Sequence, residues 1–123
     1  GVVTDGGFRD SPEIARLAIP AYHQRPSAPT NLTLHQAIDI DVPIGCGDVA
    51  VWPGDIVVGD AEGVVVIPAA IADAIAAEAV EMTAFEDFVE EKVLEGRSIL
   101  GLYPPTDEQS RADFAAWRAE RGR

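Results

Sequence analysis

The chain has 123 residues, 47% of them hydrophobic, and its 9 basic and 21 acidic side chains give a formal charge of −12 at pH 7. Such an acidic balance argues against nucleic acid or an anionic membrane as the main partner, because both require a basic surface. The composition is that of a globular chain long enough to bury a core, and no apolar run is long enough to span a bilayer. Cys46 is the only cysteine, which excludes an internal disulfide and fits a reducing cytoplasm, where we expect the protein to act.

The chain opens on a short β-prone run that enters a turn at Gly6-Gly7 and leaves it at Arg9. Residues 11–18 then predict a short helix, and residues 19–23 a strand that returns to the same sheet. This β-turn-α-β order favours an α/β or layered arrangement. Because Gly1-Val2-Val3 already has the pattern of the middle of a strand, we expect an N-terminal part of the fold to be missing from the chain.

The middle of the chain is its most β-like part. Leu34 to Ile44 alternates apolar and acidic residues, which predicts a strand whose even positions face inward, with Pro43 marking an end or an edge. Three further runs, residues 49–52, 56–58 and 64–67, are separated by turns rich in Gly and Asp. This spacing predicts a β-meander or part of a small barrel.

The remainder of the chain is predicted to be helical. A long apolar periodicity starts after Pro68 and stops at Gly96, with a break near Met82-Thr83 as an alternative. Its many acids are expected to form a solvated face. A last helix is predicted over residues 106–121, with Thr106 and Gln109 as its capping box.

The first stretch also concentrates the most usable chemistry. The Arg9 guanidinium can polarise a bound carbonyl or carboxylate through two parallel hydrogen bonds. Asp10 and Glu13 are hard oxygen donors of the kind that suits Mg²⁺ or Mn²⁺, and their spacing places them one helical turn apart. The alternative is purely structural, because Asp-x-x-Glu at a helix start is also a capping pattern and Arg9 can simply pair with either acid.

Other polar residues carry weaker signals. Asp5 either shapes the Gly6-Gly7 turn or orients Arg9, so we treat all three turn residues as supporting ones. His23 and His35 lack a neighbouring acid–nucleophile pattern and are expected to be structural or exposed. Structural roles are also expected for a further set: Cys46 as a small buried residue, Asp55 and Asp60 in turns, and Trp52 and Trp117 in packing.

Two stretches together resemble the RraA-like family, which includes the regulator of ribonuclease activity A and the 4-hydroxy-4-methyl-2-oxoglutarate aldolases. The first is the run from Gly1 to Asp10, and the second is Pro53 to Asp60 followed by Gly63 to Pro68. They occur in the family's order within residues 1–80, which we take as the C-terminal part of the family's core, and residues 81–123 are taken as a helical extension. The resemblance implies a layered β/β/α, swivelling-domain-like fold with a small barrel.

The family's enzymes are metal-dependent lyases. The resemblance therefore implies cleavage of a 4-hydroxy-2-oxo acid to pyruvate, with oxaloacetate decarboxylation as a side activity and Mg²⁺ or Mn²⁺ as cofactor. It assigns Arg9 to catalysis and substrate binding, Asp10 to catalysis and the metal, and Glu13 to the metal. Regulatory members lack the final acid of the motif, so Glu13 favours an enzyme. A homotrimer or hexamer is expected. Two alternatives stay open: a non-catalytic regulator that binds a ribonuclease or another protein, and a sugar-acid lyase or dehydratase.

Overall fold

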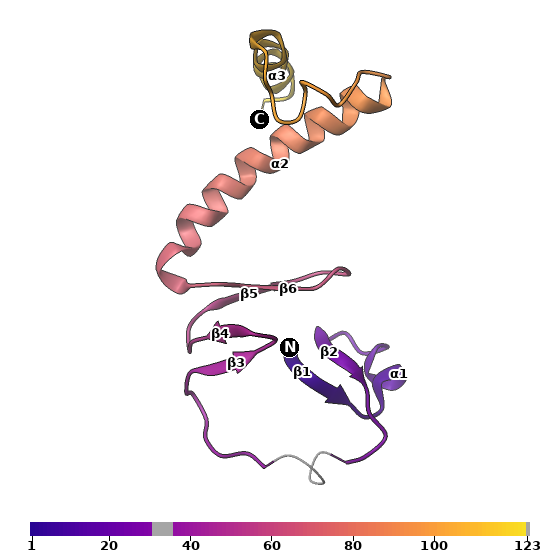
Figure 1. The fold of residues 1–123 in the computed structure, drawn as a ribbon, viewed down its shortest axis with the longest axis vertical. Helices are drawn as coiled ribbons and strands as arrows, with labels where there is room; N and C mark the ends of the chain where they lie inside the picture. Colours follow the sequence, from indigo (N-terminus) through magenta and orange to yellow (C-terminus); the bar gives the residue numbers. More distant parts are fainter. Residues whose placement is uncertain (31–35, 123) are drawn as a thin grey trace. The chain divides into compact units, whose positions relative to one another are not determined.

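The computed structural model describes residues 1–30 and 36–122. The chain forms two compact units, Gly1–Ala72 (unit 1) and Asp73–Arg123 (unit 2). Unit 1 holds the strands and unit 2 the two long helices (Figure 1). Within the described residues, no helix is both long and apolar enough to cross a membrane.

Unit 1 opens with a parallel strand pair. Strand β1 (Val2–Phe8) leads into helix α1 (Ser11–Ile14), and strand β2 (Ala21–Pro26) returns beside β1. The predicted β-α-β order is therefore confirmed. The helix ends four residues earlier than predicted, because the next large apolar side chain of the predicted helix, Leu17, is 60% exposed and finds no surface to cover it among the described residues.

The next strands form a short antiparallel hairpin, β3 (Ile44–Cys46) with β4 (Val49–Val51). Its two turn residues, Gly47 and Asp48, both have positive φ angles, 56° and 63°, as the tightest hairpin turns require.

The strand predicted from Leu34 to Ile44 is wrong over residues 36–43, which contain no strand. Leu34 and His35 lie outside the described residues. Ile38 and Ile40 are 96% and 84% exposed instead of facing inward. The left-handed φ of Asp41, 56°, breaks the extended backbone, and Pro43 has no N–H to offer a neighbouring strand.

A second hairpin joins β5 (Ile56–Gly59) to β6 (Val64–Ile67). Asp55 and Asp60 shape the turns at its ends, as expected: Asp55 accepts hydrogen bonds from the N–H groups of Trp52 and Ala69, and Asp60 from those of Glu62 and Gly63. The predicted meander is wrong, because β4 and β5 lie in different sheets. The described strands make three two-stranded sheets and no closed barrel, since the Pro53-Gly54 turn carries the chain from one sheet to the next.

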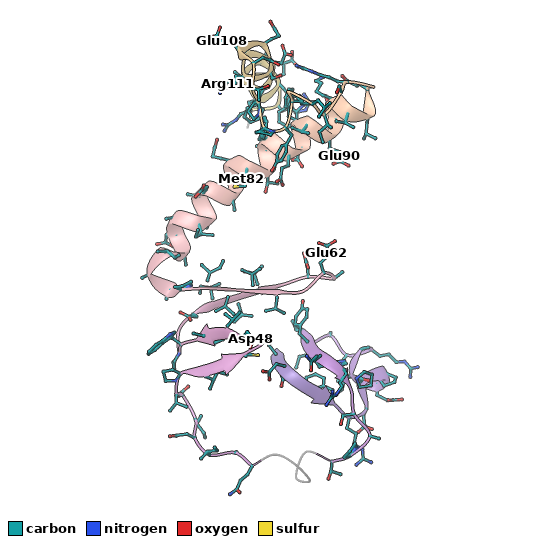
Figure 2. All side chains as sticks on the ribbon, in the orientation of Figure 1. Asp48, Glu62, Met82, Glu90, Glu108 and Arg111 are labelled. Carbon is teal, nitrogen blue, oxygen red and sulfur yellow. The ribbon has the colours of Figure 1, made fainter. Side chains whose placement is uncertain are left out.

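Unit 2 is a helical hairpin with its own core. A short 3₁₀ helix (Ala69–Ile71) leads into helix α2 (Ala72–Leu94), which runs unbroken through Met82, so the alternative of a break there is wrong (Figure 2). Gly96 ends the helical stretch with a φ of 96°, as predicted. Helix α3 (Glu108–Arg121) is capped by Asp107, not Thr106: the Asp107 carboxylate accepts a hydrogen bond of 2.6 Å from the Ser110 N–H.

The core of unit 2 is built from aromatic and aliphatic side chains. Phe88, Leu102 and Trp117 are 0%, 1% and 5% exposed, and Phe85 and Phe114 pack against them. The expectation that Trp117 is a packing residue is thus confirmed. The same expectation for Trp52 is wrong, because its side chain is exposed at the start of a turn.

Candidate active site

Asp10 sits where β1 ends and α1 begins. Its backbone is left-handed, with φ 58° and ψ 29°, a conformation that costs a non-glycine residue about 1–3 kcal/mol but that Asp tolerates better than most. The backbone carbonyl of Asp10 accepts hydrogen bonds from the N–H groups of Glu13 and Ile14. Its carboxylate makes no capping hydrogen bond to the helix. The capping alternative is therefore wrong for the Asp10 side chain.

Arg9 lies directly beside this carboxylate. Its Nε is 3.6 Å from Asp10 Oδ1, and the two side chains are 51% and 70% exposed. An ion pair this open to solvent contributes little stability, because water screens it and both side chains keep their freedom to move. The pair is consequently available for a ligand at little cost to the fold.

Glu13 is held near this pair by its backbone. Its N–H donates to the Asp10 carbonyl over 3.1 Å, and its side chain is exposed on the first turn of α1. Asp10 and Glu13 thus project from one short turn with hard oxygen donors that suit Mg²⁺ or Mn²⁺. Within the described residues, no three His, Cys, Asp or Glu side chains lie close enough together to enclose a metal ion. The described residues therefore offer the right donor type, but only part of a coordination shell.

Gly6 and Gly7 lie within β1, so the turn predicted there is wrong, and close packing requires glycine at position 7. A Cβ at Gly7 would lie 2.7 Å from the Ser27 Cβ and 3.1 Å from the Arg25 carbonyl, so only glycine fits against β2 here. The Gly6 N–H donates to Thr4 Oγ1 over 3.0 Å. The pairing of β1 with β2 shifts register between Thr4 and Gly7, so the strand is irregular directly before the Arg9–Asp10 pair.

Asp5 is engaged away from Arg9. Its Oδ2 accepts a hydrogen bond of 3.1 Å from the N–H of Gly47, which lies in the turn between β3 and β4. This hydrogen bond ties β1 to a neighbouring hairpin rather than orienting the arginine. This link depends on residues 42 positions apart, so the local sequence pattern gave no signal for it.

A cavity of about 390 Å³ lies within unit 1, and all six strands contribute to its lining. Its walls are mainly apolar, with Asp5, His23 and Cys46 among the polar exceptions. Arg9, Asp10 and Glu13 do not line it. Local sequence reasoning missed this cavity because its walls come from strands that only the fold brings together.

His23 was expected to be structural, and its contacts agree with a half-buried position. Its ring packs on Phe8, with ring centroids 4.9 Å apart. Its Nδ1 is buried and has no hydrogen-bond partner among the described residues. Cys46 is likewise half-buried rather than fully enclosed.

Comparison with curated proteins connects this geometry to known sequences. The chain is 37% identical over 101 residues to an uncharacterized protein of Methanocaldococcus jannaschii, a match that covers 80% of this chain and 47% of the relative. It is 40% identical over 68 residues to a protein of Halalkalibacterium halodurans named "Putative 4-hydroxy-4-methyl-2-oxoglutarate aldolase", which covers 55% of this chain and 32% of the relative. The chain thus spans less than half the length of these relatives.

A solved structure supports the fold. The crystal structure of an uncharacterized protein from Pseudomonas syringae pv. tomato superposes with a TM-score of 0.73 at 20% sequence identity, over 91% of this chain and 57% of that one.

Residues 1–66, which include β1, the Arg9–Asp10 pair and most of the hairpins, match the RraA-like family, described as Aldolase/RraA. The chain therefore belongs to the RraA-like family, as its sequence motifs indicated.

Proposed function

We propose that this chain supplies the Arg9–Asp10 part of the active site of a divalent-metal-dependent carbon–carbon lyase. The reaction is cleavage of a 4-hydroxy-2-oxo acid, such as 4-hydroxy-4-methyl-2-oxoglutarate, to pyruvate, with oxaloacetate decarboxylation as a side activity. The observation that carries the proposal is the backbone of Asp10: it is held left-handed, at a cost in stability, while its carboxylate takes no part in capping the helix. Family membership and the name of the Halalkalibacterium halodurans relative support the same reaction class.

The proposed chemistry asks the site to stabilise negative charge. Cleavage next to a 2-oxo acid pushes electrons into the keto group and leaves a pyruvate enolate, so an oxyanion develops in the transition state. Arg9 suits this need because its planar guanidinium stays protonated and donates two parallel hydrogen bonds to a carboxylate or enolate oxygen. Its exposure at the end of β1 leaves those donors accessible to a substrate.

Asp10 and Glu13 are the residues that would hold the divalent ion, directly or through bound water. When bound, the ion supplies positive charge that lowers the energy of the developing oxyanion. Asp10 also keeps the Arg9 guanidinium near the same point, since the two side chains already form an ion pair. Mg²⁺ and Mn²⁺ both accept such carboxylate ligands.

Pyruvate release from 4-hydroxy-4-methyl-2-oxoglutarate tests the proposal, measured with Mg²⁺ present and again after chelation. We expect chelation to abolish release, and Arg9→Ala to lower kcat/KM by about 100-fold or more, as losing an oxyanion donor does. Arg16→Ala is the matched control, because it removes an arginine located just beyond α1 and should leave release unchanged. Release that survives both chelation and Arg9→Ala would refute the proposal.

A non-catalytic role in binding a protein is the second candidate. It is favoured by one observation: Arg9 and Asp10 are exposed and do not line the cavity of unit 1, a position that also suits a docking contact. The same assay separates the two. Co-purification with a ribonuclease or another protein, without turnover of 4-hydroxy-4-methyl-2-oxoglutarate or oxaloacetate at saturating Mg²⁺ or Mn²⁺, would favour the binding role.

A further inference from the structure

The carboxyl ends of β1 and β2 lie at the same edge of their sheet, because the two strands run parallel (Figure 1). Their register pairs Phe8 with Pro26, the last residues of the two strands. The next residues along the chain are Arg9 and Ser27, and neighbouring strands lie about 4.8 Å apart. In open α/β sheets, ligands bind just beyond the carboxyl ends of parallel strands. Ser27 therefore lies beside Arg9 at the edge where such a sheet binds its ligand.

The backbone holds Ser27 against the peptide unit that leads into Arg9. The Ser27 N–H donates a hydrogen bond of 2.7 Å to the Phe8 carbonyl, whose carbon is bonded to the Arg9 nitrogen. The preceding residue, Pro26, adds rigidity because its ring fixes the backbone φ angle. The two residues are thus held side by side, although helix α1 and strand β2 separate them in sequence.

The Ser27 side chain fills the space that is left by the absence of a side chain at Gly7. A Cβ at Gly7 would lie 2.7 Å from the Ser27 Cβ and 3.4 Å from its Oγ. Glycine at position 7 therefore lets Ser27 pack directly against β1, close to Arg9. Ser27 is half-buried, whereas the residues on either side of it, 24–26 and 28–30, are exposed. The side chain thus lies against β1 rather than pointing away from it.

The hydroxyl of Ser27 is not used by the fold. Within residues 1–30 and 36–122 it makes no hydrogen bond, and the contact with β1 is made by the Ser27 backbone N–H. Packing against Gly7 requires only a small side chain, so alanine would serve equally well. A serine hydroxyl is both a donor and an acceptor, and here it lies half-buried next to the residue that carries an exposed guanidinium. The position therefore offers a free donor to an anionic ligand of Arg9.

We propose that Ser27 is a substrate-binding residue, whose hydroxyl donates a hydrogen bond to the C1 carboxylate of the 2-oxo acid that Arg9 binds. The inference rests on the proposed function and adds a second binding group to it. Every 2-oxo acid carries this carboxylate next to its keto group, so the contact is the same for 4-hydroxy-4-methyl-2-oxoglutarate, oxaloacetate and pyruvate. The carboxylate keeps its charge throughout the reaction. Ser27 therefore binds the ground state and the transition state alike, which lowers KM and leaves kcat unchanged.

Steady-state kinetics of Ser27→Ala tests the inference, with Mg²⁺ present. We expect KM to rise by about tenfold or more for both 4-hydroxy-4-methyl-2-oxoglutarate and oxaloacetate, with kcat little changed, because a hydrogen bond to a charged group is lost. The dissociation constant of pyruvate, measured by calorimetry, should rise by the same factor. Ser98→Ala makes the same chemical change in the loop between α2 and α3, and as the matched control it should leave all of these values unchanged.

Amide exchange separates substrate binding from a structural role of Ser27. Because the hydroxyl takes no part in the fold, Ser27→Ala should leave the exchange rates of β1 and β2 unchanged. Ser27→Thr retains a hydroxyl and should bind pyruvate more tightly than Ser27→Ala does. Together the two variants assign the change in affinity to the hydroxyl and not to a loss of packing.

Three results would overturn the inference alone. The first is a Ser27→Ala variant with unchanged KM and pyruvate affinity, in a protein that loses activity on Arg9→Ala. The second is a rise in KM for 4-hydroxy-4-methyl-2-oxoglutarate only, which would mean that Ser27 binds the 4-hydroxyl that oxaloacetate lacks. The third is faster amide exchange of β1 and β2 in Ser27→Ala. Pyruvate release that survives chelation and Arg9→Ala, or no pyruvate binding by the unchanged chain, would instead refute the proposed function together with this inference.

Discussion

The two units of this chain differ in how far their apolar side chains are buried. In unit 2 the helices close over a core that contains every fully buried apolar side chain of the described residues. In unit 1 the strands are at least as apolar, yet their valines and isoleucines stay exposed or half-buried. Local amphipathic pairing is therefore enough to complete a helical hairpin, whereas strands need partners that this chain does not supply among its described residues.

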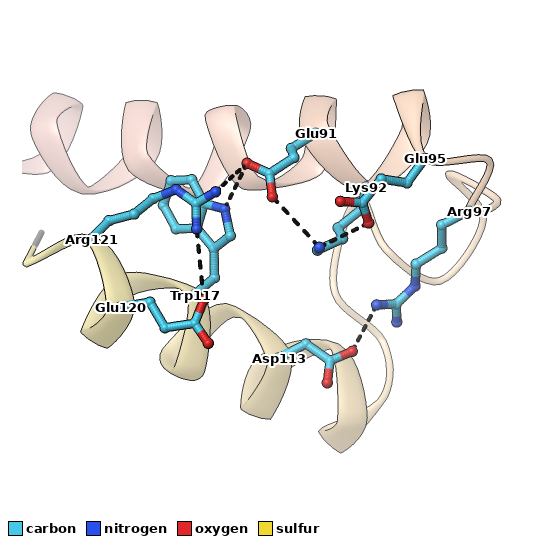
Figure 3. A network of polar contacts seen from close by, with 8 residues as sticks. All are labelled: Glu91, Lys92, Glu95, Arg97, Asp113, Trp117, Glu120 and Arg121. Atoms are coloured by element: carbon cyan, nitrogen blue, oxygen red, sulfur yellow. Dashed lines mark hydrogen bonds and ion pairs between the residues drawn. The ribbon is translucent and has the colours of Figure 1, made fainter.

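Polar contacts reinforce the contrast. In unit 2 the core is bordered by polar contacts between α2, α3 and the loop that joins them (Figure 3). Glu91 accepts hydrogen bonds from the Trp117 indole and from Arg121, and Arg97 binds Asp113 and Ser110. The candidate site in unit 1 shows instead a single open ion pair. We expect a ligand-binding site to keep its charged side chains accessible to the ligand. In a structural unit, charged side chains pair with one another instead.

The largest effect is expected from Phe88→Ala, because Phe88 is fully buried and touches Phe85, Phe114 and Trp117. Removing such a ring costs about 3–5 kcal/mol, so we expect the helical hairpin to unfold or become marginal. Urea unfolding followed by circular dichroism measures it. Val80→Ala, on the exposed side of α2, is the control and should change the unfolding free energy little. Equal losses for both would contradict the core assigned to unit 2.

A smaller effect is expected from Gly59→Ala in unit 1. A Cβ at Gly59 would lie 2.6 Å from the Tyr22 ring, so the ring must shift, at a cost of about 1–3 kcal/mol. Faster amide exchange in β5 and β6 measures the loss. Gly63→Ala meets nothing within 4 Å and is the control. Replacing Tyr22 by valine in the Gly59→Ala background should restore protection, and a failure to do so would show that the ring is not the cause.

The cap of α3 is expected to contribute less. Asp107→Ala removes the acceptor for the Ser110 N–H and should cost unit 2 about 1 kcal/mol. Asp107→Asn keeps an acceptor oxygen and should retain most of that stability. Thermal unfolding of the two variants side by side measures the difference. A loss from Thr106→Ala that exceeds the loss from Asp107→Ala would instead restore Thr106 as the cap.

Acid is expected to weaken unit 2 gradually. The Trp117 indole N–H bonded to Glu91 lowers the pKa of that carboxyl below its ordinary 4.5, and the Gln109 and Arg97 hydrogen bonds lower the pKa of Asp113 below 3.8. Because the folded pKa values are depressed, this stabilisation is complete above the ordinary values and is lost as the pH falls through the lowered ones. Trp117 fluorescence at decreasing pH measures it, and Glu91→Gln should make the loss shallower. An unchanged acid profile would exclude Glu91 as a contributor.

High pH is expected to weaken the polar contacts of unit 2 through Lys92. The Glu95 carboxylate, which accepts a hydrogen bond from Lys92, raises the pKa of that amine above 10.5. The pH dependence is opposite to that of the carboxyls. The contribution of Lys92 to stability is complete below pH 10.5 and is lost as the pH rises through the raised pKa.

Much of this fold could be predicted from local patterns. The β-α-β opening, strands β4, β5 and β6 and both long helices follow from periodicity, turn residues and glycine stops, and these depend on neighbours in sequence. The errors occur where distant neighbours decide. The alternation from Leu34 to Ile44 predicted a strand, but no partner strand lies beside residues 36–43 and Asp41 turns left-handed.

The candidate site shows the same division. Arg9, Asp10 and Glu13 were identified from residue type and motif, and the structure brings Arg9 and Asp10 together. The pattern could not tell that Asp10 would leave the helix uncapped, because this depends on a backbone φ angle. It also could not place Asp5 against Gly47, a contact that only the folded chain creates. The metal and catalytic roles of the three residues remain predictions.

The most direct test of the central claim is Asp10→Asn. Asparagine also tolerates the left-handed backbone, so the change removes the charged oxygen and leaves the turn intact. Mg²⁺-dependent pyruvate release and urea unfolding are measured on the same preparation. The account predicts an unfolding free energy changed by no more than about 0.5 kcal/mol, together with release lowered by about 100-fold or more. Retained release with a clear loss of stability would contradict it and return Asp10 to a structural role.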